Sequence, residues 1–245
     1  MLRGNPTSSL DYLCQGARLI LRPGLRRFIV VPLLVNIILF VIATVALVHV
    51  YSDFLEALMQ WLPSWLAFIA WLLWLAFAFL LLLVYGYTFN IITNLVAAPF
   101  YGVLAERVET ELTGVSPPEE SLSQLIPRTL RRELVKLWYF VSRGIVVMLI
   151  LFVLWFVPGV NIIAVIISAL WAAWCMSVQY LDYPADSHRM AFKDLRSQLL
   201  SKPLSSFSFG GLVMFGSMIP VVNIVVMPIA VAGASVYWAR EIKSG

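Results

Sequence analysis

Four long apolar stretches hold none of the Asp, Glu, Lys and Arg residues of this chain, and they constrain its fold more than any other feature. Of the 245 residues, 61% are hydrophobic and 12% are charged, which is about half the charged fraction of an ordinary globular protein. Apolar segments of this length cross a bilayer as helices. The sequence therefore predicts an all-α integral membrane protein built on Phe28–Val50, Trp61–Pro99, Gly144–Leu181 and Phe207–Ala239.

The basic residues predict which side of the membrane each connection faces. All 17 lysines and arginines lie before the first stretch, between the second and third, between the third and fourth, or after the fourth. The remaining connection, Tyr51–Gln60, carries Asp53 and Glu56 but no basic residue. Basic loops stay in the cytoplasm, so this connection faces out and both termini face in. We expect transmembrane helices over 24–50 and 61–112, the second with a cytoplasmic extension.

The third and fourth stretches then begin and end on the same side, which predicts a helical hairpin in each. Pro158-Gly159 interrupts the third stretch, and Pro220 interrupts the fourth within a similar Pro-x-Val-Asn-Ile pattern. The first arms have about 14 and 13 residues and reach roughly 20 Å, whereas a bilayer core is about 30 Å thick. We therefore expect re-entrant, hemi-penetrating hairpins over 144–181 and 207–240.

Three amphipathic segments complete a single membrane domain over 1–245. Their apolar residues recur at spacings of three and four, which is typical of helices on a membrane surface. We expect an interfacial helix over 1–23, which contains no signal peptide, and cytoplasmic-surface helices over 121–143 and 186–200. His188 and the basic residues of the middle helix are expected to face solvent or headgroups; the latter are Arg128, Arg131, Arg132 and Lys136. The alternative is that these four take a direct part in anion entry.

The most unusual polar segment is Arg22–Phe28, at the start of the first apolar stretch. Pro23 and Gly24 end one helix, and the next helix begins with unpaired N–H groups. That end of a helix favours anions, yet it carries Arg26 and Arg27. A bound oxyanion would reconcile these charges; the alternative is that the arginines hold lipid phosphates. The candidate anion site consists of Gly24, Leu25, Arg26 and Arg27.

Neutral amide side chains mark a candidate path through the first two apolar stretches. Asn36 lies in the first stretch, and Asn90 and Asn94 share a helix face in the second. A polar group in a membrane needs a partner or water. These three asparagines are therefore candidate pore-lining residues, or they pack against a neighbouring helix.

Catalytic chemistry is not apparent in the sequence. The four apolar stretches contain no Asp, Glu, Lys or Arg, so the ionisable groups of a proton relay are missing there. We find no nucleophile–base pair, metal-ligand cluster or phosphate loop, and Cys14 and Cys175 fit neither a disulfide framework nor a metal site. We expect no catalytic residues, cofactor, metal or nucleic-acid partner, and a passive pathway suits this composition.

Four segments together form a specific pattern: Gly24-Leu25-Arg26, Val96-Ala97-Ala98-Pro99-Phe100, Tyr180-Leu181-Asp182-Tyr183-Pro184-Ala185-Asp186 and His188-Arg189-Met190-Ala191-Phe192. With these segments, the chain resembles the CysZ sulfate permease family of bacteria. The resemblance covers nearly the whole chain. It implies sulfate uptake across the inner membrane for cysteine biosynthesis, two crossing helices with two hemi-penetrating hairpins, a homo-oligomer, and a sulfate site at the Gly-Leu-Arg motif.

Two function classes follow from these observations. The first is a channel-like sulfate permease in contact with membrane lipids. The alternative is a membrane scaffold or lipid-binding protein that transports nothing and whose arginines hold headgroup phosphates. A membrane enzyme is disfavoured.

Overall fold

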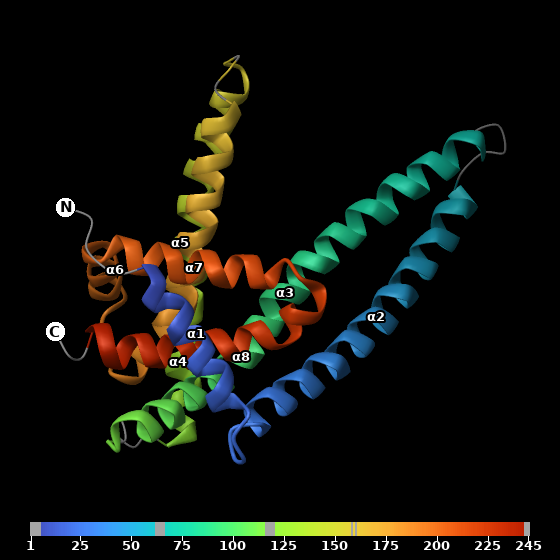
Figure 1. Ribbon diagram of the computed structural model, residues 1–245. Helices are drawn as coiled ribbons and strands as arrows, with labels where there is room; N and C mark the ends of the chain where they lie inside the picture. Colours follow the sequence, from blue (N-terminus) through green and yellow to red (C-terminus); the bar gives the residue numbers. More distant parts are fainter. Residues whose placement is uncertain (1–5, 62–66, 116–120, 158, 160, 243–245) are drawn as a thin grey trace. The chain divides into compact units, whose positions relative to one another are not determined.

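The computed structural model describes the backbone of residues 6–61, 67–115, 121–157, 159 and 161–242. These residues form helices and short turns, with no strand among them. Figure 1 shows the helices in chain order. They are α1 (Pro6–Ile20), α2 (Arg27–Trp61), α3 (Ala67–Thr113), α4 (Leu122–Trp155), α5 (Asn161–Ser187), α6 (Phe192–Ser201), α7 (Pro203–Ser217), α8 (Pro220–Tyr237) and a π-helical segment, η2 (Trp238–Ile242).

Length and hydropathy confirm the expected all-α membrane protein. Four helical segments in the described residues are long and apolar enough to cross a bilayer, namely Val30–Phe54, Ser123–Trp155, Asn161–Ser187 and Val225–Ile242. The depth to which the last three enter the membrane stays a prediction.

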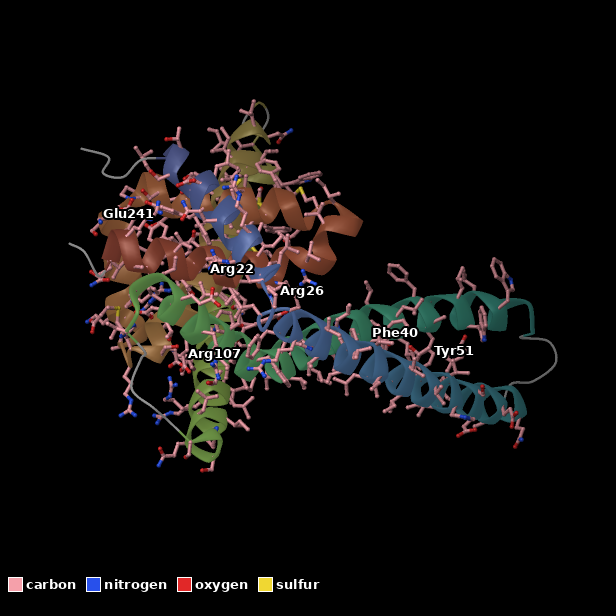
Figure 2. The ribbon with its side chains drawn as sticks, turned by 60° about the horizontal axis from the view of Figure 1, so that its bottom comes forward. Arg22, Arg26, Phe40, Tyr51, Arg107 and Glu241 are labelled. Carbon is pink, nitrogen blue, oxygen red and sulfur yellow. The ribbon has the colours of Figure 1, made fainter. Side chains whose placement is uncertain are left out.

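The chain divides into two compact units, each described by itself. The hairpin unit is Val31–Ala97, and the core unit is Met1–Val30 together with Ala98–Gly245. In the hairpin unit, α2 and α3 run side by side, with Phe40 and Tyr51 labelled in Figure 2. Rings interdigitate along this pair, and the Phe54 and Phe77 centroids are 4.4 Å apart. Aromatic pairs of this kind contribute about 0.5–1.5 kcal/mol beyond the burial of their surface.

The core unit is organised around α8, on which α1, α5 and α7 pack (Figure 1). Small residues allow the close approach. A Cβ atom on Gly16 of α1 would lie 2.5 Å from the Gly233 nitrogen of α8, and one on Gly210 of α7 would overlap the Ala173 carbonyl oxygen of α5. Hydroxyls join α1 to α7, since Ser9 Oγ donates to the Ser205 carbonyl at 3.0 Å. Small and hydroxyl residues are typical of helix contacts in membrane proteins.

Helix boundaries differ from the expected ones where charged and apolar segments join. The surface helix expected over 121–143 and the first hairpin arm form one continuous helix, α4, because no breaker separates them. Similarly, α2 continues through the expected outer connection to Trp61. The second arms start at Asn161 and Pro220. Gly159 has φ +83°, which ends a helix, whereas Pro158 lies outside the described residues.

One face of the N-terminal helix packs on the rest of the core unit, and its placement at the membrane surface stays a prediction. In α1, Tyr12, Leu19 and Ile20 are buried, while Leu10 is 56% exposed. These buried residues of α1 contact α7 and α8, whereas Cys14 and Leu21 of the expected apolar face are exposed, as Leu10 is.

Candidate functional site

The expected anion site forms the turn that joins α1 to α2. Gly24 has φ +99°, a conformation that glycine adopts without strain. The Leu25 amide donates to the Arg22 carbonyl at 3.2 Å, and the Leu25 side chain is buried. Leu25 therefore anchors the turn. In the described part of the chain, the amides of Gly24, Arg26 and Arg27 have no backbone acceptor, so they remain available to an external anion.

The three arginines of this turn differ in their partners; Figure 2 labels Arg22 and Arg26. Arg22 forms an ion pair with Glu111 on α3, with Nη1 and Oε2 3.1 Å apart. Arg26 is exposed, and its Nε donates to the Leu21 carbonyl at 2.8 Å. Arg27 is also exposed, and its Cζ lies 5.0 Å from the centre of the Phe28 ring. Hence Arg26 and Arg27 form no ion pair with a carboxylate of the described residues, and they lie at the positive end of α2.

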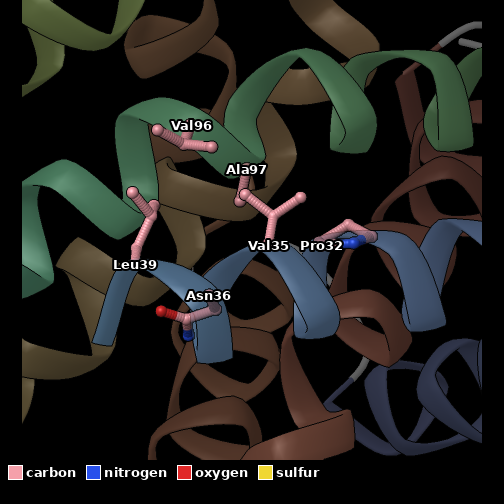
Figure 3. Close-up of a pocket in the computed structure, with 6 residues that line it drawn as sticks. All are labelled: Pro32, Val35, Asn36, Leu39, Val96 and Ala97. Atoms are coloured by element: carbon pink, nitrogen blue, oxygen red, sulfur yellow. The ribbon is translucent and has the colours of Figure 1, made fainter. Parts of the chain in front are cut away.

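The candidate pore-lining residues belong to the hairpin unit. Asn36 and Asn94 are half-buried, and each has an interaction partner; the Asn90 side chain lies outside the described residues. Asn36 contributes to a pocket of about 10 Å³ between α2 and α3, lined also by Pro32, Val35, Leu39, Val96 and Ala97. Figure 3 shows Val35 directed toward Ala97, with Asn36 directed away from Val96. This pocket has room for about one water molecule, so it is too small to conduct an oxyanion.

Sequence reasoning missed a buried charge cluster between α4 and α5, defined by Arg132, Glu133, Lys136 and Asp182. Arg132 binds Asp182 through two nitrogens, with Nη2 2.7 Å and Nε 2.9 Å from Oδ1. Lys136 Nζ lies 2.5 Å from Glu133 and 3.4 Å from Asp182. The expectation that these basic residues face solvent or headgroups is wrong for Arg132 and Lys136, because Asp182 of α5 contacts both and Glu133 also pairs with Lys136.

Two further ion pairs hold the same region. Arg128 Nη1 lies 2.6 Å from Asp186 Oδ2, so Arg128 does not face solvent as expected either; Arg131 is exposed. His188 Nε2 lies 2.8 Å from both carboxylate oxygens of the buried Glu109. The same imidazole stacks on Trp238, so the expectation of a surface histidine is also wrong.

The segment Tyr180–Asp186, which carries the most specific family resemblance, is therefore part of the packing and ion pairing of the core unit. Residues 180–185 are buried, and the two aspartates bind arginines of α4. Their role is to join α4 to α5. Within the described residues, no three His, Cys, Asp or Glu side chains gather as a metal site.

The apolar helices define a multi-pass, all-α integral membrane protein, and the cationic turn formed by Gly24–Arg27 is its candidate anion site. A profile of the family described as "Sulfate transporter CysZ/Etoposide-induced protein 2.4" matches residues 12–228. The chain therefore belongs to this family.

Curated relatives match almost end to end. A sulfate transporter CysZ of Pseudomonas fluorescens (strain Pf0-1) is 44% identical over 238 residues, which cover 96% of this chain and 94% of the relative. One of Pseudomonas syringae pv. tomato is 44% identical over 94% of this chain and 91% of its own length. One of Pseudomonas aeruginosa (strain PAO1) is 42% identical, with 96% and 95% covered.

Proposed function

We propose that this chain is a channel-like sulfate permease of the membrane, and that transport rather than catalysis is its function. The observation that carries the proposal is the similarity, over nearly the whole chain, to relatives named sulfate transporters. The cationic turn supports the same conclusion, since exposed guanidinium groups and available amides suit a doubly negative tetrahedral ion.

In this proposal, sulfate binds at Gly24, Leu25, Arg26 and Arg27. Leu25 shapes the turn through its buried side chain and its hydrogen bond to Arg22. The amides of Arg26 and Arg27 and their side chains bind the ion, and the Asn36, Asn90 and Asn94 side chains line the subsequent path. Exposed cations bind weakly enough to release the ion again, as a passive pathway requires.

The setting is also part of the proposal. We place the protein in the bacterial inner membrane with both termini in the cytoplasm, since basic residues flank every apolar stretch except at Tyr51–Gln60. The hairpins over 144–181 and 207–240 enter from that side. A pocket of about 10 Å³ cannot conduct sulfate, so we infer that a homo-oligomer completes the pathway. The sulfate supplies cysteine biosynthesis.

Uptake of radioactive sulfate into proteoliposomes tests the proposal. Arg26→Ala with Arg27→Ala removes two charge-assisted hydrogen-bonding groups, each worth about 1.5–3 kcal/mol. We therefore expect at least a roughly tenfold weaker apparent affinity for sulfate. Arg18→Ala is the control, because Arg18 is an exposed cation on α1, outside the turn. A wild-type protein with no sulfate-selective flux would instead indicate a scaffold or a lipid-binding protein.

A further inference from the structure

Arg196 of α6 is a cation that is held firmly in place but not neutralised. Its Cζ lies 4.4 Å from the centre of the Tyr139 ring and 4.9 Å from that of Phe192. Its Nε is buried and has no hydrogen-bond acceptor in the part of the chain that the structure describes. Contacts with two ring faces fix a guanidinium without using its donors. The fork of Arg196 is thus oriented and available.

A neighbouring arginine on the same ring shows the contrast. Arg132 also lies over Phe192, at 5.2 Å, but Asp182 neutralises it through a bidentate pair. No described carboxylate forms an ion pair with Arg196. Asp194 is two residues away on α6 and exposed, so it lies on a different face of the helix. Arg196 can therefore pair with an anion that is not part of the described chain.

Arg196 contacts Tyr139 of α4, and the position of Tyr139 along α4 corresponds to the headgroup layer. Tyr139 lies five residues before Gly144, where the uncharged part of α4 begins, and this separation is about 7.5 Å along the helix axis. The polar layer on each side of a bilayer core is about 5–8 Å thick. Trp138 is 73% exposed beside it, as is typical of the aromatic belt at a membrane surface.

An apolar groove continues from this level along the same face of α4. Arg143 is exposed, lies one turn after Tyr139, and has no ion pair in the described residues. Beyond it, a shallow and largely open groove of about 340 Å³ is lined by residues of α4 alone, namely Val146, Leu149, Ile150, Val153 and Leu154. Spacings of three and four place these residues in a row with Tyr139 and Arg143.

We propose that Arg196 and Arg143 bind the phosphate of an anionic lipid, and that an acyl chain of this lipid lies in the groove of α4. A cationic fork followed by an apolar groove matches an amphiphile with a phosphate head. Free sulfate or inorganic phosphate has the same anionic chemistry as the phosphate of a lipid, but it has no acyl chain that could occupy the groove. The site uses none of the residues of the Gly24–Arg27 turn, so it can be tested separately from transport.

Native mass spectrometry of the purified protein, titrated with phosphatidylglycerol or phosphatidylcholine, measures this binding. We expect Arg196→Gln to weaken phosphatidylglycerol binding about fivefold, the usual effect of losing one cation at an anionic membrane surface. Arg196→Lys should bind with intermediate strength, because it keeps the charge and loses the fork. Binding of phosphatidylcholine should not change. Arg131→Gln is the matched control, since Arg131 is exposed on α4 two turns before Tyr139.

Two more variants keep the proposal testable if Arg196→Gln does not fold. Arg143→Gln should also weaken phosphatidylglycerol about fivefold, and Ile150→Trp should weaken it by filling the groove. Equal phosphatidylglycerol binding in the wild type and in these variants would overturn the proposal. So would a loss of sulfate or inorganic phosphate binding in lipid-free detergent without a loss of phosphatidylglycerol, which would identify a free-oxyanion site.

Discussion

Removing the ammonium group of Lys136 should destabilise the core unit severely. The Lys136 and Asp182 side chains are 1% exposed and that of Glu133 is 6% exposed, so none of the three charges is solvated. Lys136→Met keeps most of the side-chain volume but takes away the ammonium partner of Glu133. Breaking a buried ion pair from one side costs about 3–5 kcal/mol. For a chain of this size, that cost lowers the melting temperature by roughly 10 °C.

The partner variants show whether the cost comes from the charge. Glu133→Gln leaves Lys136 with Asp182, whose Oδ2 is 3.4 Å from Nζ, so the loss should be smaller. The double variant, Lys136→Met with Glu133→Gln, removes both charges, and we expect it to be more stable than Lys136→Met alone. A coupling free energy of about 1–3 kcal/mol is typical for residues in one such network.

Thermal unfolding in detergent, followed by size-exclusion chromatography, measures these differences. Arg131→Met is the control, because Arg131 lies on the same helix and is exposed. A melting temperature of Lys136→Met within about 2 °C of the wild type would refute the reasoning, since it would mean that Glu133 is already solvated.

Two other predictions concern helix contacts. Gly210→Ala should lower the melting temperature by several degrees, because its Cβ atom would overlap the Ala173 carbonyl of α5. Gly211→Ala is the control and should not lower it, since nothing lies near its Cβ position. Equal melting temperatures of the two variants would contradict the close approach of α5 and α7. Tyr12→Phe should cost about 1.5–3 kcal/mol, because the Tyr12 hydroxyl donates to Glu241 at 3.0 Å. Burial, with help from Glu241, raises the pKa of Tyr12, so the neutral phenol is favoured in the folded state. The stability difference should hold below pH 10 and disappear as the pH rises through this raised pKa; a difference that is unchanged at pH 11 would contradict this reasoning.

The helical class of the fold was predictable from the sequence, whereas the partners of the charged residues were not. Uncharged stretches of this length have to form helices in a bilayer. In contrast, Arg132 and Asp182 are 50 residues apart, and only the packing of α4 on α5 shows that they meet. Local periodicity placed the basic residues on the polar face of a helix, but it does not distinguish a face exposed to water from a face that meets carboxylates of another helix.

The candidate site shows the same division between local and tertiary information. The turn at Gly24 was predictable, because proline restricts the backbone at its own position and glycine allows conformations that other residues avoid. The pairing of Arg22 with Glu111 was not, since it joins α3 to the end of α1. This pair removes Arg22 from the cations available to an anion, and Arg26 and Arg27 remain.

The burial of α8 shows what hydropathy alone leaves undetermined. The apolar windows of Val30–Phe54 and Ser123–Trp155 have 0% of their residues buried within the protein, whereas the window of Val225–Ile242 is 61% buried. All three segments are long and apolar enough to cross a bilayer, yet α1, α5 and α7 cover the last one. Its contacts include hydroxyl groups, since Ser235 Oγ donates to the Ala105 carbonyl at 3.3 Å. A large side chain at Ala234, which is fully buried, should therefore disrupt the core unit, whereas the same side chain at the exposed Val153 should be tolerated.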